Sequence, residues 1–255
     1  IIYGLEESVD IEDLIKKEDI VVSFTLRGYI KRDTLSSYNA QRRGGKGKAA
    51  MRTADDDAVT HLFTATTHSF ILFFSSTGRV YKLKGYKIPV GTSQSKGRAL
   101  VNLLNLQESE TITNFLVLPE DKTDWDNLNL IFATSDGLIR RSSIDEFSSI
   151  PSNGKIAIGL VEGDTLVGVR LAKNDEHILL ASKNGQAARF AVDSMRIIKS
   201  RSSVGVIGMN LEKQDKVVSI SIISGAEKDI AVRDEYLNIP LELRILIKTL
   251  DNKEL

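Results

Sequence analysis

Short runs of apolar residues, separated by turns that contain glycine, recur along the whole chain. Four segments share one form: an apolar run, a polar turn that ends in glycine, and a second run that carries Lys or Arg. Apolar, β-branched and aromatic runs of about five residues around such a turn are typical of β-hairpins, because glycine supplies the positive φ that the turn requires. The pattern predicts four hairpins, over residues 21–32, 71–84, 130–143 and 178–192, with turn glycines at Gly28, Gly78, Gly137 and Gly185.

A further glycine-containing strand and another apolar run follow each predicted hairpin. The second glycine comes 17 to 20 residues after the hairpin glycine, at Gly47, Gly97, Gly154 and Gly205. Each unit thus offers about four short strands in about 50 residues, which is the repeat length of a propeller blade. We therefore expect a single all-β domain of propeller-like, four-stranded blades, at about 20–70, 71–128, 129–176 and 177–228.

Several of the predicted strands alternate apolar and polar residues. Such alternation favours antiparallel sheets with one face in water, and it marks Ile71, Phe73, Val80 and Leu83 as core candidates. Helical periodicity is convincing only near residues 8–19 and is weak in the last segment. A fifth hairpin glycine is expected at position 236, where the chain has Tyr236.

The repeat therefore stops, and residues 229–255 are predicted to be a divergent tail. This tail could be a strand that closes the last blade, a capping helix or a foreign end. The acidic start of the chain is unlike a signal sequence and reads like a cut inside a longer polypeptide.

Charge is balanced overall but segregated along the chain. The 34 basic and 34 acidic residues cancel, which argues mildly against a nucleic-acid binder. Local sums differ sharply: residues 27–52 carry +7, residues 78–98 carry +6 and residues 106–126 carry −5. Because the Debye length in cells is about 8 Å, a phosphate backbone would respond to these local patches rather than to the total.

Several chemistries are disfavoured by composition. The chain has no cysteine, which excludes disulfides and thiol chemistry and fits a reducing cytoplasm, and no apolar run approaches the roughly 20 residues of a membrane helix. His61, His68 and His177 lack metal-site spacing, and the acidic run Asp55–Asp57 is interpreted as a solvated loop. Neither Ser93–Lys96 nor the GGKGKAA stretch has the context of a catalytic or Walker motif. We therefore expect no catalytic activity, metal or cofactor within these residues.

The stretch QRRGGKGK, residues 41–48, combines four cations with three glycines and has no acid. A flexible linker, a phosphate cradle and a nucleic-acid clamp are its three possible roles. Guanidinium and ammonium groups bind phosphate, and glycines let backbone N–H groups approach an anion. The corresponding place in the next unit, SQSKGR, is again basic, and further cations follow the hairpin glycine in every unit. These repeats predict a ring of positive charge around one rim, suited to a bent duplex.

The predicted DNA-binding residues are Gln41, Arg42, Arg43, Gly44, Gly45, Lys46, Gly47, Lys48, Lys31, Arg32, Arg79, Lys82, Lys84, Lys96, Arg98, Arg140, Arg141, Arg189 and Arg201. The alternatives are a propeller-type scaffold that binds proteins, with residues 41–48 as a linker, and, more remotely, a catalytic propeller.

At QRRGGKG, Gln41 to Gly47, the sequence resembles the C-terminal domain of the bacterial DNA gyrase A protein and its gyrase-A box. The flanking stretches DIEDLIKKEDIVVSFTLRGYIKR, THSFILFFSSTGRVYKLKGYKIP and KGRALVNLLNLQ also resemble that family, over about residues 8 to 230. The box favours gyrase over the related topoisomerase IV protein. Residues 229–255 match nothing in the resemblance, so a truncation, a frameshifted end or a divergent fifth blade are all open.

The resemblance implies a β-pinwheel, a disc of up to six blades that exchange strands with their neighbours. It implies wrapping of duplex DNA around a basic rim, which gives the chirality for negative supercoiling, and it assigns Gln41 to Gly47 as the latch between first and last blades. The implied partners are double-stranded DNA, the N-terminal region of the gyrase A protein and the gyrase B protein, with ATP and magnesium bound elsewhere in the enzyme. The implied location is the bacterial cytoplasm, at the nucleoid, with no membrane.

Overall fold

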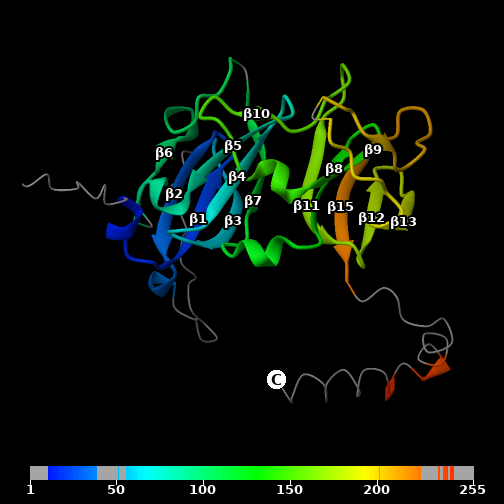
Figure 1. Cartoon of the computed structure of the whole chain (residues 1–255), viewed down its shortest axis with the longest axis horizontal. Coiled ribbons are helices and arrows are strands. Elements are labelled where there is room, and N and C mark those ends of the chain that lie inside the picture. The colour runs from blue at the N-terminus through cyan, green and yellow to red at the C-terminus, as the bar shows by residue number, and fades with distance from the viewer. Residues whose placement is uncertain are drawn as a thin grey trace, which may run out of the picture.

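Four antiparallel sheets follow one another along the chain (Figure 1). The computed structural model describes residues 11–38, 51, 56–92, 94–108, 110–200, 202–224, 235, 238–240, 242 and 243. The first sheet contains β3 (Val59–Thr66), β1 (Asp19–Thr25), β2 (Tyr29–Thr34) and β6 (Arg98–Ala99), in that order. The second contains β10 (Lys155–Ile156), β5 (Arg79–Lys84), β4 (Phe70–Ser75) and β7 (Ile112–Val117). The third contains β11 (Leu166–Lys173), β8 (Leu128–Thr134), β9 (Leu138–Ser143) and β14 (Val206–Ile207). The fourth contains β13 (Ala187–Ala191), β12 (His177–Ser182) and β15 (Val217–Ile223).

Short 3₁₀ helices join some of these strands. They are η1 (Ile11–Leu14), η2 (Leu35–Ser37), η3 (Gly85–Lys87), η4 (Leu100–Asn102), η5 (Lys122–Trp125) and η6 (Ile144–Phe147). Among the described tail residues, Glu235, Asn238, Glu242 and Leu243 have helical conformation. The prediction of an all-β fold built from at least four repeated blades is confirmed.

Neighbouring blades exchange strands. We call the four sheets blades 1 to 4, and we call β6, β10 and β14 donated strands, because each comes from the next sequence unit and pairs with the outer hairpin strand of the blade before it. Within the described residues, blade 4 has three strands and β13 is its outer one. Each blade is thus completed by the chain segment that also leads into its neighbour.

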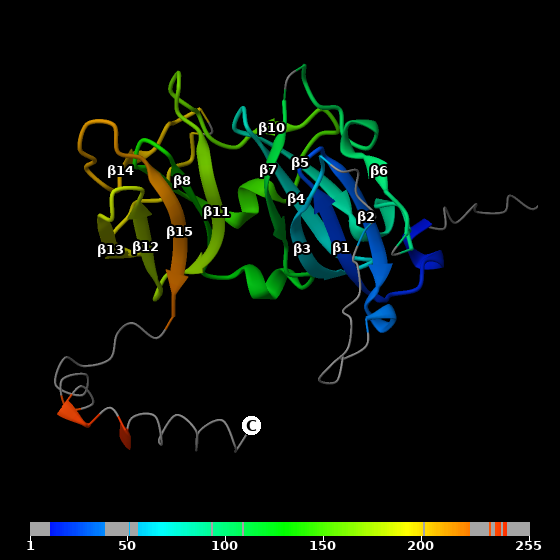
Figure 2. The ribbon, with the colours of Figure 1, turned by 180° about the vertical axis from the view of Figure 1, so that it is seen from behind.

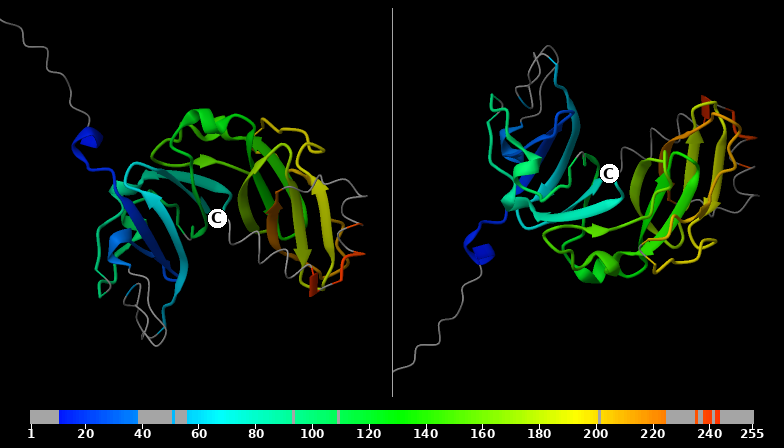
Figure 3. Two further views of the ribbon diagram at one scale, coloured as in Figure 1. Left: turned by 90° about the horizontal axis from the view of Figure 1, so that it is seen from below. Right: turned by 90° about the horizontal axis from the view of Figure 1, so that it is seen from above.

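The blades are arranged side by side in an arc. Blade 1 lies at one end and blade 4 at the other, as the front and back views show (Figures 1 and 2). Seen along the arc's axis, the donated strands and the loops that precede them lie on the convex side, and β3, β7, β11 and β15 lie toward the concave side (Figure 3). Loops at the donated strands therefore form the outer edge of the molecule.

The hydrophobic core is divided into three clusters, each between two adjacent blades. Ile71 and Phe73 of β4 pack toward blade 1, whereas Leu72 and Phe74 of the same strand pack toward blade 3. Both faces of β4 are therefore buried, and the expectation of sheets with one wet face is wrong for this strand. The reason is the stacking of blades: an inner blade has a neighbour on each face, so alternate side chains enter different clusters.

The glycines that define the repeat have the backbone geometry that the sequence predicts. All four hairpin glycines have positive φ, and so have the second glycines of units 2 to 4. At Gly97, φ is +75° and a Cβ atom would lie 2.5 Å from the carbonyl oxygen of Ile30. This glycine therefore permits both the turn and the close approach of β6 to β2.

Candidate nucleic-acid interface

Exposed cations gather in the loops at the outer edge of the arc. We call the described residues of 88–97, 148–154 and 196–205 the rim loops, since they lead into the donated strands β6, β10 and β14 on the convex side (Figure 3). Lys96 and Arg98 are exposed, as expected for phosphate contacts. The Lys96 ammonium lies 4.2 Å from the centroid of the Tyr29 ring, and Arg98 begins β6, opposite Ile30.

Sequence reasoning missed other cations at this edge. Lys87, Arg196 and Lys199 are exposed, and Lys155 is half-buried, with its ammonium donating to the Glu146 carbonyl. They lie in or beside the rim loops, and Lys199 and Lys155 occupy the places in the repeat that correspond to the first and last residues of QRRGGKGK. Position relative to the second glycine of each unit was the signal that could have identified Lys155 and Lys199.

Lys31, Arg140 and Arg141 are buried and cannot reach a phosphate backbone. The Lys31 ammonium donates to the Thr92 carbonyl. Arg140 donates from Nη1 to the Ala157 carbonyl at 2.7 Å. These three side chains stabilise the chain that connects blades, because buried charge is tolerated only when it is well hydrogen-bonded. We therefore remove them from the set of DNA-contacting residues.

Arg141 shows the fullest set of such bonds. Its Nε and Nη2 donate to the side-chain oxygens of Asn129 (3.0 Å) and Asn174 (2.7 Å), and its Nη1 donates to the carbonyls of Val192 (3.0 Å) and Met195 (2.8 Å). Burial lowers the pKa of Arg141 from its ordinary value, yet the guanidinium stays charged. The guanidinium group of Arg141 therefore joins blade 3 to the turn that leads toward the donated strand β14.

The same clamp recurs at the equivalent residue of blades 1 and 2. Arg32 Nε donates to the Ile88 carbonyl at 2.8 Å, and Lys82 donates to the Ser148 carbonyl. Burial lowers the pKa of both side chains, and for Lys82 the nearby Lys84 lowers it further. In blades 1 to 3, the recurrence of Lys or Arg four residues after the hairpin glycine is thus explained by strand exchange, because the cation binds the connection from the next unit.

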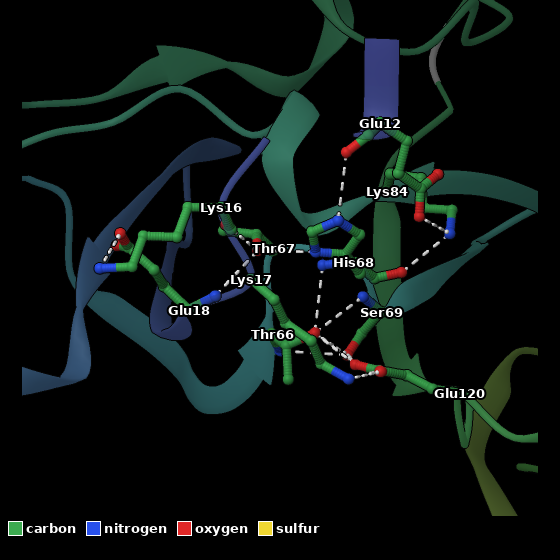
Figure 4. A network of polar contacts seen from close by, with 10 residues as sticks. All are labelled: Glu12, Lys16, Lys17, Glu18, Thr66, Thr67, His68, Ser69, Lys84 and Glu120. Carbon is green, nitrogen blue, oxygen red and sulfur yellow. Dashed lines mark hydrogen bonds and ion pairs between the residues drawn. The ribbon is translucent and has the colours of Figure 1, made fainter. Parts of the chain in front are cut away.

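Two further predicted contacts are also engaged with the protein. Arg79 Nη2 donates to the carbonyls of Asn153 (2.8 Å) and Gly154 (3.2 Å) at the outer edge of blade 2. Lys84 lies away from the rim loops, where it pairs with Glu12 at 2.7 Å and donates to the His68 carbonyl at 2.9 Å (Figure 4). Arg79 remains at the candidate interface, and Lys84 does not.

The network around Lys84 attaches the first described residues to blades 1 and 2 (Figure 4). Thr67 accepts from the Glu18 amide at 3.1 Å and donates to the Lys16 carbonyl at 2.9 Å. Glu120 accepts from Ser69 at 3.0 Å and also from Lys17 and Thr66. Burial alone would raise the Glu120 pKa, but these hydrogen bonds and the Lys17 charge outweigh it and lower the pKa to about 2.

An acidic residue at each hairpin turn is a second repeated feature that the sequence did not reveal. Asp57 Oδ1 accepts from the amides of Arg27 and Ala58, both at 3.0 Å, so it is a buried turn residue rather than part of a solvated acidic loop. Glu110, Asp164 and Asp215 occupy the same place in blades 2 to 4. Each carboxylate ties the hairpin turn to the start of the innermost strand.

The remaining predicted residues fall into two groups. Arg189 is exposed on β13, the outer strand of blade 4. Gln41, Arg42, Arg43, Gly44, Gly45, Lys46, Gly47, Lys48 and Arg201 lie outside the described residues. The candidate interface therefore consists of the cations in or beside the rim loops, which are Arg79, Lys87, Lys96, Arg98, Lys155, Arg196 and Lys199.

The described part of the chain offers neither a metal-ligating cluster nor a long apolar helix. No group of three or more His, Cys, Asp or Glu side chains is placed to hold a metal ion in the described ranges. None of the described helical segments combines the length and apolar character that a bilayer crossing requires.

Strand-exchanged antiparallel blades with a cationic outer edge define a β-pinwheel, a propeller-like class of domain. The family described as "DNA gyrase C-terminal domain, beta-propeller" matches residues 19–66, 69–119, 128–173 and 176–224. This chain belongs to that family. The four matched segments contain the strands of the four blades, apart from the donated ones that each blade receives from the next segment.

Three comparisons illustrate the relationship. The DNA gyrase A protein of Rickettsia prowazekii (strain Madrid E) is 53% identical over 238 residues, which cover 93% of this chain and 26% of that protein. The solved structure of a DNA gyrase A C-terminal domain matches with a TM-score of 0.66 and 28% identity, over 81% of this chain and 66% of that one. A topoisomerase IV C-terminal domain, at 22% identity and a TM-score of 0.63, covers 82% of this chain and 62% of that chain and shows the shared fold.

The chain spans about a quarter of the length of the curated relatives it matches. The alignment with the R. prowazekii protein covers 238 of the 255 residues. The number of residues that it leaves out is smaller than the number that follow Ser224 in the chain. Part of the chain after Ser224 therefore aligns with a gyrase A protein, whereas the family model ends at residue 224, and the divergent tail over residues 229–255 stays a prediction.

Proposed function

We propose that this chain binds duplex DNA without sequence preference and bends it around the convex edge of the blade arc. The observation that carries the proposal is the set of exposed cations in and beside the rim loops of a DNA gyrase C-terminal domain. These cations come from several blades, and the loops that carry or adjoin them lie on the convex side of the arc (Figure 3). Such an arrangement suits a polyanion that must follow a curve.

The affinity would come mainly from the release of counterions. Each phosphate that a Lys or Arg neutralises contributes a slope of about −0.9 to the dependence of log affinity on log salt concentration. The preference among DNA sequences would come from the ease of bending, because the bending stiffness of DNA depends on its sequence. Base contacts are not required by this mechanism.

Within the larger protein, bending around this domain would set the handedness with which one segment of the DNA crosses another. That handedness would determine that the supercoils are negative. We propose that the N-terminal region of the gyrase A protein and the gyrase B protein, with ATP and magnesium, carry out cleavage and strand passage. The present residues would then hold DNA and perform no catalysis or cofactor binding. The expected place of action is the nucleoid in the bacterial cytoplasm.

Residues Gln41 to Gly47 would act as a latch between the first and last blades. The proposal is supported by their place in the repeat: they precede the residues of unit 1 that correspond to the donated strands β6, β10 and β14. Blade 4 has three strands within the described residues, so a strand from unit 1 would complete it by pairing with β13.

Religation of a nicked circle tests wrapping directly. The circle is closed by ligase in the presence of the protein, and the shift in linking number is read from the topoisomer distribution. We expect the shift to disappear when Arg42, Arg43 and Lys46 are replaced by Ala, and to shrink in the double variant Lys96→Ala and Arg98→Ala. An unchanged distribution in the triple variant would exclude a wrapping role for the box.

Binding is measured separately with a duplex of about 40 base pairs at two salt concentrations. If the triple variant loses wrapping but keeps most of its affinity, the box is a latch rather than an anchor. Absence of binding by the unmodified protein would overturn the proposal and favour a scaffold for other proteins.

A further inference from the structure

A groove crosses the boundary between blades 2 and 3 at the outer edge of the arc. Its volume is about 800 Å³, and we call it the rim groove. One wall is the edge of blade 2, and the other is the rim loop before β14. The polar side chains that line it are those of Arg79, Ser149, Asn153, Lys155, Lys199 and Ser202.

The chemistry of the rim groove suits a phosphate. Three cations and two hydroxyls line it, and no acidic side chain does so among the described residues. Glu146 lines an adjoining hollow together with Lys155 and Lys199, and its carboxylate lies 4.0 Å from Nη2 of buried Arg140. The charge nearest the groove is therefore strongly positive, and hydroxyl donors stand beside it.

Hydrogen bonds join the two walls of the rim groove. Buried Arg140 donates from Nη1 to the Ala157 carbonyl at 2.7 Å and from Nη2 to the Ile198 carbonyl at 3.4 Å. The Gly159 amide donates to the Ser203 carbonyl at 3.1 Å. Arg140 and Gly159 thus position the rim loop that carries Lys199, so the groove is built by the fold and does not depend on a ligand to form it.

The repeat shows that the next blade edge, that of blade 3, lacks the equivalent cations. Arg79 follows the hairpin glycine of blade 2, and the equivalent residue of blade 3 is Leu138. Lys155 follows the second glycine of unit 3, and the equivalent residue of unit 4 is Val206. The corresponding edge of blade 3 therefore has apolar side chains in place of two of the three cations.

We propose that the rim groove binds a phosphodiester of duplex DNA and that Lys199 is its principal contact. The proposal rests on the proposed DNA binding and makes it specific: the grip on DNA is uneven, with a strong point where blades 2 and 3 meet. Arg79 and Lys155 hold the wall and add fixed positive charge. Lys199 is the exposed cation, and it belongs to the opposite wall.

The test is a salt titration of the affinity for a duplex of about 40 base pairs, with the intact polypeptide that carries these residues. We expect Lys199→Ala to weaken binding about three- to ten-fold at 0.1 M salt and to reduce the slope by about 0.9, the value for one phosphate. Lys199→Arg, which keeps the charge, should retain most of the affinity.

Lys173→Ala is the matched control. Lys173 is an exposed lysine that ends β11, at the opposite end of the sheet from the hairpin turn, and its loss changes the net charge by the same amount. An unchanged affinity in this variant, beside the loss in Lys199→Ala, supports the groove. Equal losses in both variants, or no loss in Lys199→Ala while the unmodified protein binds, would overturn it. Failure of the unmodified protein to bind would instead reject the proposed function, and the groove with it.

Discussion

At the scale of residues, lysine and arginine have two different roles in this protein. Arg98 and Lys199 are exposed at the outer edge, whereas Arg140 and Arg141 are buried between blades and hydrogen-bond to carbonyls. Side chains of the two groups differ little in chemistry. Their roles depend on whether the strand face they occupy meets water or the connection from the next unit.

Arg141→Lys separates the structural role from DNA binding. A lysine keeps the charge but cannot form the four bonds of the guanidinium fork, so the buried Asn129 oxygen loses its donor and the Asn174 oxygen loses one of its two donors. We expect the free energy of unfolding to fall by about 2–4 kcal/mol, with the affinity for DNA unchanged where the protein is folded. Thermal denaturation and a band-shift assay measure the two quantities.

Arg98→Ala is the opposite case and the control for that variant. Its guanidinium is exposed, so we expect a weaker affinity for DNA and a midpoint of thermal denaturation that stays the same. A loss of DNA affinity in Arg141→Lys at a temperature where it is fully folded would contradict the division between buried and rim cations.

At the scale of elements, the donated strands are very short and depend on the glycine before them. β6 and β14 each contain two residues, and each is preceded by a glycine with positive φ, Gly97 or Gly205. So short a strand has few ladder bonds of its own. Its position depends on the close approach of that glycine to the neighbouring hairpin strand.

Gly97→Ala tests this dependence. The new Cβ would lie 2.5 Å from the Ile30 carbonyl oxygen, and alanine is strained at a φ of +75°. We expect a loss of about 3 kcal/mol or more in unfolding free energy, together with faster amide exchange in β6. Gly163→Ala is the control, because its φ of +81° is similar but nothing lies within 4 Å, so strain alone should cost about 1–2 kcal/mol. Equal losses in the two variants would refute the role of close approach.

At the scale of the whole molecule, folding depends on carboxylates that join one segment to another. Asp57, Glu110 and Asp215 each accept hydrogen bonds at a hairpin turn, and Glu120 joins the first described segment to blades 1 and 2 (Figure 4). The pKa of each is lower than usual, because the hydrogen bonds they accept outweigh the opposing effect of burial where it applies. These groups stabilise the folded state only in their charged form.

The protein should therefore lose stability in acid. For Glu120, the folded pKa of about 2 is below the usual 4.5, so its contribution is full above about pH 4.5 and disappears as the pH falls toward 2. Partial exposure and screening reduce this contribution to about 2 kcal/mol. Glu120→Gln should lower stability at pH 7 and flatten the pH dependence between pH 5 and pH 2, as measured by denaturant unfolding. A pH profile parallel to that of the unmodified protein would contradict the assignment.

The repeated units were predictable from the sequence, because each hairpin turn needs a glycine at one position and the apolar runs around it are long enough to pair. The exposed cations at Lys96 and Arg98 were predictable from their place beside such a glycine. Burial of Lys31, Arg140 and Arg141 was not, because it depends on a segment about 50 or more residues away that folds over them. The place of Lys199 in the rim groove was not predictable either, because its wall of the groove faces a strand of another unit.

The sequence by itself determined the kind of element, the repeat and the family, since turn geometry and strand pairing within a hairpin are local. Only the tertiary structure decided which cations face water. Strand exchange brings each connection against the preceding blade, and stacking covers both faces of an inner sheet, so identical side chains at neighbouring strand positions become either a buried clamp or part of the outer edge.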